Sequence, residues 1–421
     1  MAWNNVLLSK KFILYKEGIS NKSVEEFFIQ NEVDYYLKTD DNELSYLDDG
    51  FIVIKSPGIP NDTIFLLQCK RLKIKVINDI ELFYLLRSDI NYIGITGSCG
   101  KTTTCNLLYN IMKEKYKVYV CGNIGIPIFK FINVQLDFLI VELSSYQLEY
   151  IDKFKPKYFI ILNIFNHHLN HHHSFNNYLA SKLNPLKNMD SSDTLIINEV
   201  LSRYVRRQNV LFKIFTFSNS GKSDAINEDN LLIFKDKKLD VSNIEFFKYD
   251  YNKENFLSLF ILLSLLEINN YKEIILDFKN LPNRMEEVIN KNDLIVINDS
   301  KSTSFNALNE GIKYCLKNYK DYEIIVIMGG KIDYDEIIQN VNIIKALDNY
   351  KVYCYGENKE LINKLIKCKI FNSLKDVIEN LDIKKKLVIL FSPAAQSFDQ
   401  FSSYEERGET FKKLIINKLK N

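Results

Sequence analysis

The sequence has no excess of charge of either sign, because its 421 residues include 55 lysines and arginines and 53 aspartates and glutamates. A net charge of +2 excludes the broad positive field on which non-specific nucleic-acid binding depends, so we expect no nucleic-acid partner. The seven cysteines form no Cys-X-X-Cys pair, which argues against a disulfide framework and against a cysteine-based zinc site. Scattered cysteines of this kind are typical of a reducing compartment.

Long apolar runs are also absent. No segment approaches the roughly 18 uninterrupted apolar residues that a membrane-spanning helix needs. The first residues, MAWNNVLLSKKF, lack the basic start and the apolar core of a signal peptide. We therefore expect a cytoplasmic protein that does not insert into a membrane. The remaining composition, 46% hydrophobic and 26% charged, is typical of a globular protein, and the length predicts roughly two to four domains.

Short apolar, β-branched runs alternate with helical patterns along almost the whole chain. Several runs are continuous, which is typical of parallel strands that are covered on both faces. The pattern predicts α/β architecture with open parallel sheets. Boundaries near Ser88 and near Leu281-Pro282, each just before a new strand–helix series, predict three domains that span 1–89, 90–280 and 281–421. The predicted strands are 51–54, 90–95, 118–121, 138–141, 158–162, 194–197, 294–297, 324–328, 352–355 and 387–391.

One glycine-rich segment joins a predicted strand to a predicted helix. Residues 94–102 read Gly-Ile-Thr-Gly-Ser-Cys-Gly-Lys-Thr. Such a loop cradles phosphates with its backbone N–H groups, while its lysine contacts the β- and γ-phosphates and its hydroxyl binds Mg²⁺. The standard spacing places a glycine where Ile95 stands, so the first glycine of the loop is Gly97. The segment predicts a nucleoside-triphosphate site with Lys101 and Thr102 at its centre.

Polar clusters directly follow five further predicted strands. Ligands of open α/β sheets bind outside the carboxyl ends of the strands, so these clusters predict one active site in a cleft between two domains. Glu142 ends a strand and is a candidate Mg²⁺ ligand, the alternative being a surface glutamate. Hydroxyls and free N–H groups after Phe391 predict an anion site suited to a carboxylate, the alternative being a helix cap without a ligand. The clusters begin at Glu142, Asn163, Asn298, Gly329 and Ser392.

All five histidines lie in one segment, Asn166-His-His-Leu-Asn-His-His-His173. Histidine tracts are typical of metal binding or of an expression tag, and the internal position argues against a tag. A zinc site would need further cysteine, histidine or carboxylate ligands at a fitting spacing, and no such spacing is evident. The position after a strand end predicts one histidine in the active site and others that are incidental. The alternative is a solvated loop in which no histidine is a ligand.

These motifs together resemble the Mur ligases, the ATP-dependent amide-forming enzymes of peptidoglycan synthesis. The resemblance spans nearly the whole length and is strongest to the members that add D-glutamate. It implies a Rossmann-like N-terminal domain for the UDP substrate, a central P-loop ATPase domain with a parallel sheet, and a Rossmann-like C-terminal domain for the amino acid and the nucleotide. Besides the phosphate loop, it rests on the segments 55–60, 122–127, 142–149, 281–286, 298–303 and 392–401.

The resemblance also implies a reaction and its participants. An ATP-dependent ligase of this kind would add D-glutamate to UDP-N-acetylmuramoyl-L-alanine through an acyl phosphate, with two Mg²⁺ sites and a carbamylated Lys182. We expect a monomer. The implied catalytic residues are Lys101, Glu142, His168 and Lys182, and the implied metal ligands are Thr102, Glu142, His168 and Lys182. The implied ATP contacts are Gly97, Ser98, Gly100, Lys101, Thr102, Thr103, Asn255, Arg284 and Asp299. The implied substrate contacts are Asn123, Ser144, Lys301, Thr303, Lys331, Ser397, Phe398 and Tyr404.

The sequence departs from the family pattern at several places. The usual Asp-His-Leu-Asp-Arg-His reads His-His-Leu-Asn-His-His at 167–172, and Asn283 replaces a histidine before Arg284. The loop that contains Lys331 is shortened, and the glycine-rich uridine-binding turn retains only Gly18. Two alternatives therefore stay open. One is a sister Mur or folylpolyglutamate-type ligase that adds a different amino acid, and the other is a nucleotide-binding relative without catalysis.

Overall fold

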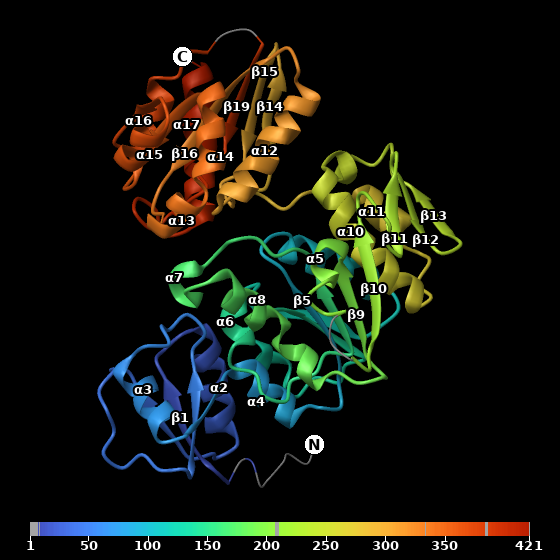
Figure 1. Ribbon diagram of the computed structural model, residues 1–421, viewed down its shortest axis with the longest axis vertical. Coiled ribbons are helices and arrows are strands. Elements are labelled where there is room, and N and C mark those ends of the chain that lie inside the picture. Colours follow the sequence, from blue (N-terminus) through green and yellow to red (C-terminus); the bar gives the residue numbers. More distant parts are fainter. Residues whose placement is uncertain (1–6, 8, 207–209, 333, 384–385, 421) are drawn as a thin grey trace. The chain divides into compact units, whose positions relative to one another are not determined.

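The computed structural model describes residues 7, 9–206, 210–332, 334–383 and 386–420. The chain divides into two compact units, Met1–Ile164 with His171–Phe278, and Phe165–Asn170 with Lys279–Asn421. The described residues form three sheets, two in the first unit and one in the second (Figure 1). None of the helices in these residues is both long enough and apolar enough to cross a membrane.

The first sheet has four strands that are all parallel. They are β1 (Lys11–Tyr15), β2 (Tyr35–Lys38), β3 (Phe51–Lys55) and β4 (Lys75–Ile77), with the helices α2 (Ile19–Gln30), α3 (Ile64–Arg71) and α4 (Asp79–Leu86). The strand order is β2-β1-β3-β4, as in a Rossmann-like doubly wound sheet. The central strands are apolar because helices cover them, and Ile13, Val53 and Phe65 are fully buried in one core.

The second sheet has nine strands and leads into the phosphate loop. Its strands are β5 (Asn91–Thr96), β6 (Val118–Gly122), β7 (Phe138–Glu142), β8 (Tyr158–Ile161), β9 (Thr194–Asn198), β10 (Lys213–Ser218), β11 (Ala225–Glu228), β12 (Leu231–Phe234) and β13 (Lys237–Asp240). Their order is β13-β12-β11-β10-β9-β8-β5-β7-β6. The strands are parallel from β6 to β11 and antiparallel from β11 to β13.

Helices alternate with the strands of this second sheet along the chain or follow the last of them. They are α5 (Lys101–Met112), α6 (Ser145–Leu148), α7 (Leu169–His172), α8 (Phe175–Leu183), α9 (Glu199–Ser202), α10 (Asp250–Leu265) and α11 (Lys272–Asp277), with 3₁₀ turns at Ile128–Phe131, Asn184–Asn188 and Glu245–Lys248. Helix α5 directly follows β5, and α5 and α10 bury Leu108 and Phe260 in the same core. This packing fixes the helix whose first turn borders the phosphate loop.

The third sheet belongs to the second unit and has six strands. They are β14 (Glu286–Lys291), β15 (Leu294–Asn298), β16 (Glu323–Gly329), β17 (Lys351–Tyr355), β18 (Cys368–Ile370) and β19 (Leu387–Phe391). Their order is β14-β15-β19-β16-β17-β18, and only the β14–β15 pair is antiparallel. The helices are α12 (Phe305–Asn318), α13 (Tyr334–Gln339), α14 (Val341–Ala346), α15 (Lys359–Leu365), α16 (Leu374–Glu379) and α17 (Tyr404–Lys420), with a 3₁₀ turn at Leu347–Asn349.

The predicted α/β architecture with parallel-rich sheets is confirmed, and each predicted apolar run forms a strand. The antiparallel edges were not predicted. Two of the antiparallel pairs, β11–β12 and β14–β15, are joined by two-residue turns, Asp229-Asn230 and Asn292-Asp293, in which both residues have a positive φ. This conformation is that of a type I′ hairpin turn, which reverses the chain and makes the adjoining strands antiparallel. The domain boundaries at 89/90 and 280/281 stay predictions.

Glu81 of α4 provides a test of how this fold is held together. Its carboxylate is fully buried and accepts hydrogen bonds from the backbone N–H groups of Asp152 (2.9 Å), Lys153 (2.8 Å) and Phe154 (2.9 Å). We predict that Glu81→Gln lowers the free energy of unfolding by about 2–3 kcal/mol. The reason is that the glutamine amide places an NH₂ group, which cannot accept a hydrogen bond, against these backbone N–H groups. Urea unfolding followed by circular dichroism measures the loss. Exposed Glu114 is the control, and Glu114→Gln should stay within about 0.5 kcal/mol of the unmodified protein. Equal effects of the two changes would contradict this role.

Candidate active site

The phosphate loop lies between β5 and α5, and Asn163 holds its backbone. Ser98 N donates to Asn163 O and Cys99 N donates to Asn163 Oδ1, both at 2.9 Å, and Asn163 Nδ2 donates to Cys99 O at 3.1 Å. Gly100 precedes α5 with a φ of 86°, and a Cβ there would lie 2.4 Å from Asn255 Nδ2, so this position requires glycine. The loop thus has a defined shape, with the predicted ATP contact Asn255 against it. Asn163 has a role that the sequence analysis missed, although its position after a strand end was noted.

Two predicted catalytic side chains, Lys101 and Glu142, border this loop. Lys101 Nζ donates to Gly97 O at 2.7 Å and to Ser98 O at 3.2 Å, so the ammonium lies at the loop itself. Glu142 is 1% exposed, and its Oε1 accepts a hydrogen bond from Asn123 Nδ2 at 3.0 Å. Among the described residues no donor reaches its other oxygen, Oε2. A buried carboxylate oxygen in this state is suited to binding a cation.

Lys182, on α8, is also buried next to the loop. Its Nζ lies 3.2 Å from Thr96 Oγ1 and 3.1 Å from Gly97 O, and 4.9 Å from the centre of the Tyr178 ring. Burial lowers the pKa of Lys182 well below its ordinary value, and the nearby charge of Lys101 lowers this pKa further. Burial therefore favours the neutral form of this amine.

The remaining first-unit candidates lie close to helix starts. Thr102 and Thr103 stand in the first turn of α5, and Thr103 is 8% exposed. Ser144 caps α6: its Oγ accepts from Gln147 N at 3.3 Å, and Gln147 Oε1 accepts from Ser144 N at 3.0 Å. This capping box gives Ser144 a structural role. Its contact with substrate stays a prediction.

A pocket of about 180 Å³ adjoins Asn123 in the first unit. Most of its lining residues come from the segments that follow β1, β3 and β6. These segments leave the carboxyl ends of parallel strands, where ligands of such sheets bind. Asn123 was predicted as a substrate contact, whereas the contributions of Ser20 and Pro57 were not predicted. The lining residues are Ile19, Ser20, Pro57, Gly122, Asn123, Gly125, Pro127 and Gln147.

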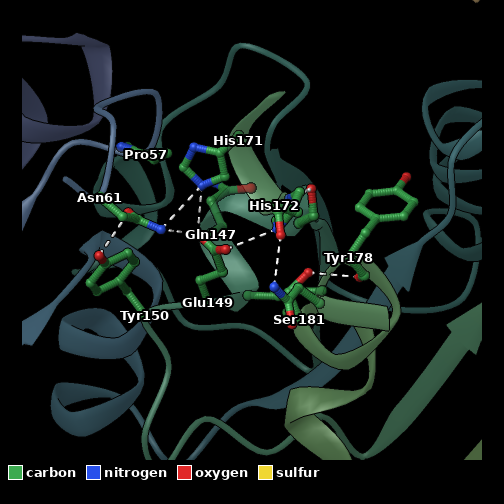
Figure 2. A network of polar contacts seen from close by, with 12 residues as sticks. Pro57, Asn61, Gln147, Glu149, Tyr150, His171, His172, Tyr178 and Ser181 are labelled. Carbon is green, nitrogen blue, oxygen red and sulfur yellow. Dashed lines mark hydrogen bonds and ion pairs between the residues drawn. The ribbon is translucent and has the colours of Figure 1, made fainter. Parts of the chain in front are cut away.

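The histidine segment is divided between the two units. His168 belongs to the second unit and has a left-handed φ of 56°, and its role as a metal ligand stays a prediction. His171 and His172 belong to the first unit and both contact Glu149, at 2.7 and 2.9 Å (Figure 2). A carboxylate that was not evident from the sequence spacing therefore accompanies these two histidines. Sequence spacing did not reveal Glu149, because it follows α6, 22 residues before His171.

In the second unit, Asp299 follows β15 and is 8% exposed. Its Oδ1 accepts from Met285 N at 3.1 Å and its Oδ2 accepts from Ser392 Oγ at 3.0 Å. Burial raises the pKa of Asp299 to about 7, although these hydrogen bonds and the charges of Arg284 and Arg407 act in the opposite direction. The structure thus brings the predicted nucleotide contacts Arg284 and Asp299 into one electrostatic environment.

Two predicted D-glutamate contacts, Lys301 and Tyr404, lie together in the same unit. Lys301 Nζ is 3.7 Å from the centre of the Tyr404 ring. The buried side chain of Arg407 links their two segments, because it donates to Ser300 Oγ at 3.1 Å and to Ser300 O at 2.6 Å. Arg407 is a positioning residue that the sequence analysis did not single out.

The shortened loop still brings Lys331 to the predicted carboxylate site. Lys331 N donates to Gln396 O at 3.1 Å, and Gln396 N donates to Lys331 O at 3.0 Å. The adjacent Ser397 is buried, whereas Phe398 is 67% exposed. Thr303 is half-buried and precedes α12. The substrate contacts of these side chains stay predictions.

The fold and the phosphate loop define a class of enzyme. Residues 95–260 match the family model described as the Mur ligase middle domain. A solved MurF ligase from Thermotoga maritima in complex with ADP has a TM-score of 0.64 at 17% identity, covering 98% of this chain and 99% of that chain. A UDP-N-acetylmuramate-alanine ligase, MurC, from Thermotoga maritima has a TM-score of 0.60 at 16% identity, with the same coverage. The fold is that of the Mur ligases.

Relatives in sequence indicate which kind of Mur ligase this chain is similar to. The UDP-N-acetylmuramoylalanine--D-glutamate ligase of Clostridioides difficile (strain 630) is 32% identical over 396 residues, covering 88% of this chain and 85% of the relative. The ligase of the same name from Aquifex aeolicus (strain VF5) is 30% identical over 420 residues, covering 96% of this chain and 98% of the relative. The chain belongs to the family of UDP-N-acetylmuramoylalanine--D-glutamate ligases.

Asp299 leads to a prediction on the pH dependence of stability. Its folded pKa of about 7 lies above its value of about 3.9 in an unfolded chain, so the folded state binds this proton more tightly. Its contribution to stability is full below about pH 4 and is lost as the pH rises to about 7, a change of up to about 4 kcal/mol. Asp299→Asn stays uncharged and keeps an oxygen for Met285 N. It should lack this part of the pH dependence in urea unfolding, and an unchanged slope would contradict the assignment.

Proposed function

We propose that this chain is an ATP-dependent ligase that joins D-glutamate to UDP-N-acetylmuramoyl-L-alanine during peptidoglycan synthesis in the cytoplasm. The observation that carries the proposal is the buried Glu142, which ends the strand beside the one that leads into the phosphate loop. Within the described residues, its Oε2 accepts no hydrogen bond. A group of this kind is costly to bury and is expected where a cation-assisted reaction takes place. The relatives with this activity in their names match the chain over most of its length.

The proposed reaction has two steps. The carboxylate of the L-alanyl group attacks the γ-phosphorus of ATP, the bond to ADP breaks, and an acyl phosphate forms. The amine of D-glutamate then attacks the acyl carbon, loses a proton, and displaces inorganic phosphate. Phosphoryl transfer depends mainly on positioning and on neutralising charge. The loop N–H groups and Lys101 hold the phosphates, and the pocket beside Asn123 receives the UDP substrate in this proposal.

The residues of the first unit fit a bound Mg²⁺. Glu142 Oε2 and the Thr102 hydroxyl would hold a cation at the phosphates, and a carbamylated Lys182 would offer oxygen ligands to a second cation. The role of His168, which belongs to the second unit, as a metal ligand stays a prediction. When bound, Mg²⁺ neutralises charge on the transferring phosphoryl group. Oxygen ligands such as these are those that Mg²⁺ prefers.

Lys182 has the properties that carbamylation requires. Only a neutral amine attacks CO₂, and burial lowers the pKa of Lys182 well below its ordinary value. The new N–C bond forms as the nitrogen loses a proton, which converts the side chain into a carboxylate-like group. Such a group would neutralise the nearby charge of Lys101 and offer oxygen ligands to a cation.

In the second unit, the proposal assigns the nucleotide and amino-acid contacts to two groups of residues. Arg284 and Asp299 contact the nucleotide. Lys301, Thr303, Lys331, Ser397, Phe398 and Tyr404 surround D-glutamate. The cations Lys301 and Lys331 and the free N–H groups after β19 suit the two carboxylates of this amino acid. The contact between Lys331 and Gln396 supports this assignment for the shortened loop.

Lys101→Ala tests the ligase activity. We expect ADP formation to fall by about 10² to 10³-fold, because the variant lacks the cation at the β- and γ-phosphates. The assay measures ADP and phosphate with UDP-N-acetylmuramoyl-L-alanine and a panel of amino acids. Lys113→Ala, in an exposed position that follows the same helix, is the control and should keep full activity. Full activity in Lys101→Ala would exclude the ligase. Equal stimulation by other amino acids would exclude D-glutamate as the specific substrate.

Lys182→Ala tests the carbamate. We expect turnover to be abolished, and acetate added in excess to restore part of it by supplying the missing carboxylate. Incubation with ¹³C-labelled bicarbonate should give a carbamate ¹³C resonance in the unmodified protein that the variant lacks. Lys187→Ala, on the adjacent 3₁₀ turn, is the control and should retain both activity and resonance. A resonance that persists in Lys182→Ala, or full activity of this variant, would contradict the assignment.

A further inference from the structure

A second cluster of ligand-type side chains lies in the first unit, apart from Glu142 and Lys182. It consists of Glu149, His171 and His172, whose ligand atoms all lie within 4.8 Å of one another. Glu149 Oε2 is 2.7 Å from His171 Nε2, and Glu149 Oε1 is 2.9 Å from His172 Nδ1. The carboxylate therefore stands between the two imidazole rings, as Figure 2 shows. Glu149 directly follows α6, and the histidines end α7.

Both nitrogens of the buried His172 ring have a defined neighbour. His172 is 2% exposed, and its Nδ1 faces Glu149 Oε1 at 2.9 Å. The other ring nitrogen, Nε2, lies 2.9 Å from Ser145 Oγ. A hydrogen bond at one nitrogen fixes the ring orientation and leaves the other nitrogen directed at the cluster. The Nδ1 atom of His172 thus lies with the Glu149 carboxylate and His171 in one group of possible ligand atoms.

Neighbouring polar groups hold the carboxylate in place. Asn61 Nδ2 donates to Glu149 Oε2 at 3.1 Å and lies 3.3 Å from His171 Nε2. Tyr150 OH donates to Asn61 Oδ1 at 2.7 Å, which fixes the amide in turn (Figure 2). Together with the two histidines, Asn61 fixes both oxygens of the Glu149 carboxylate.

We propose that Glu149, His171 and His172 form a binding site for a borderline transition-metal cation of the Zn²⁺ class. Two imidazole nitrogens and one carboxylate oxygen are a ligand set that Zn²⁺ accepts, with a fourth position open to water. Donor atoms around a tetrahedral Zn²⁺ stand roughly 3.4 Å apart, so side-chain adjustments of about 1 Å complete the geometry. The imidazole ligands distinguish this site chemically from a Mg²⁺ site, because Mg²⁺ prefers oxygen ligands.

His171 supplies a possible metal ligand that the family pattern does not have at this position. The Mur ligase pattern has an arginine where His171 stands. An arginine there would offer charge and hydrogen-bond donors to Glu149, but it has no lone pair for a metal. Histidine at this position can serve as a third ligand. The inference does not rest on the proposed ligase activity, because its readout is metal binding.

The experiment compares metal binding by the full chain without a purification tag. Protein freed of metal by chelation is titrated with Co²⁺ in excess Mg²⁺, which occupies oxygen-ligand sites, and Zn²⁺ then displaces the Co²⁺. We expect one Co²⁺ per chain, with the intense visible absorption of four- or five-coordinate Co²⁺. In His171→Arg, which preserves a cationic partner for Glu149, we expect affinity to fall by more than about 10-fold. Zn²⁺ should raise the melting temperature of the unmodified protein and not that of the variant.

Two further variants decide where the cation binds. His173→Asn changes the adjacent exposed histidine, whose positive φ an asparagine tolerates, and it should bind Co²⁺ unchanged. Glu142→Gln removes the expected Mg²⁺ ligand and should also leave the absorption unchanged. The proposal is overturned if His171→Arg binds Co²⁺ as tightly as the unmodified protein, or if Glu142→Gln alone abolishes the absorption. A purely structural Glu149–histidine network would give no Co²⁺ absorption in any variant, which would equally refute the proposal.

Discussion

The parallel pairing of β5 with β7 and β8 is the constraint on which the geometry of the phosphate site depends. In this register Ile95 pairs with Glu142, and Thr96 pairs with Ile161. The loop after β5, the carboxylate that ends β7 and Asn163 after β8 therefore meet at one edge of the sheet. A shift of one residue would turn Glu142 to the opposite face. Continuous apolar burial of all three strands prevents such a shift, so core packing determines where the charged groups stand.

Each of the two units buries charged groups that folding alone would leave in water. Glu142 and Lys182 are each 1% exposed, and Asp299 of the second unit is 8% exposed. Neighbouring groups offset only part of the cost of burying these side chains. Burial therefore lowers the pKa of Lys182 and raises the pKa of Asp299. Partly compensated charges lower stability and are retained where a ligand interacts with them. This is why the same residues point to function more reliably than the fold does, since one fold serves many activities.

The buried strands and the phosphate loop could be predicted, because each is determined by residues that are close together in the sequence. Continuous apolar runs become buried parallel strands, and a glycine loop before a helix becomes a phosphate cradle. Strands such as β11 (AINE) and β13 (KKLD) were missed because they are short and partly polar. The roles of Asn163, Arg407 and Glu149 were missed for a different reason. Each depends on which distant segments pack together, and Arg407 bonds Ser300 across 107 residues.

The histidine segment shows how one composition produces two kinds of chemistry. Five histidines within eight residues suggest a single metal site, but the backbone separates them. His168 has a left-handed conformation, whereas His171 and His172 end a helical turn that presents both rings to Glu149. The oxygen ligands at Glu142 favour a hard cation, and the imidazoles at Glu149 favour a softer one. Donor type would therefore distinguish the two proposed cation sites, although each of them contains one glutamate.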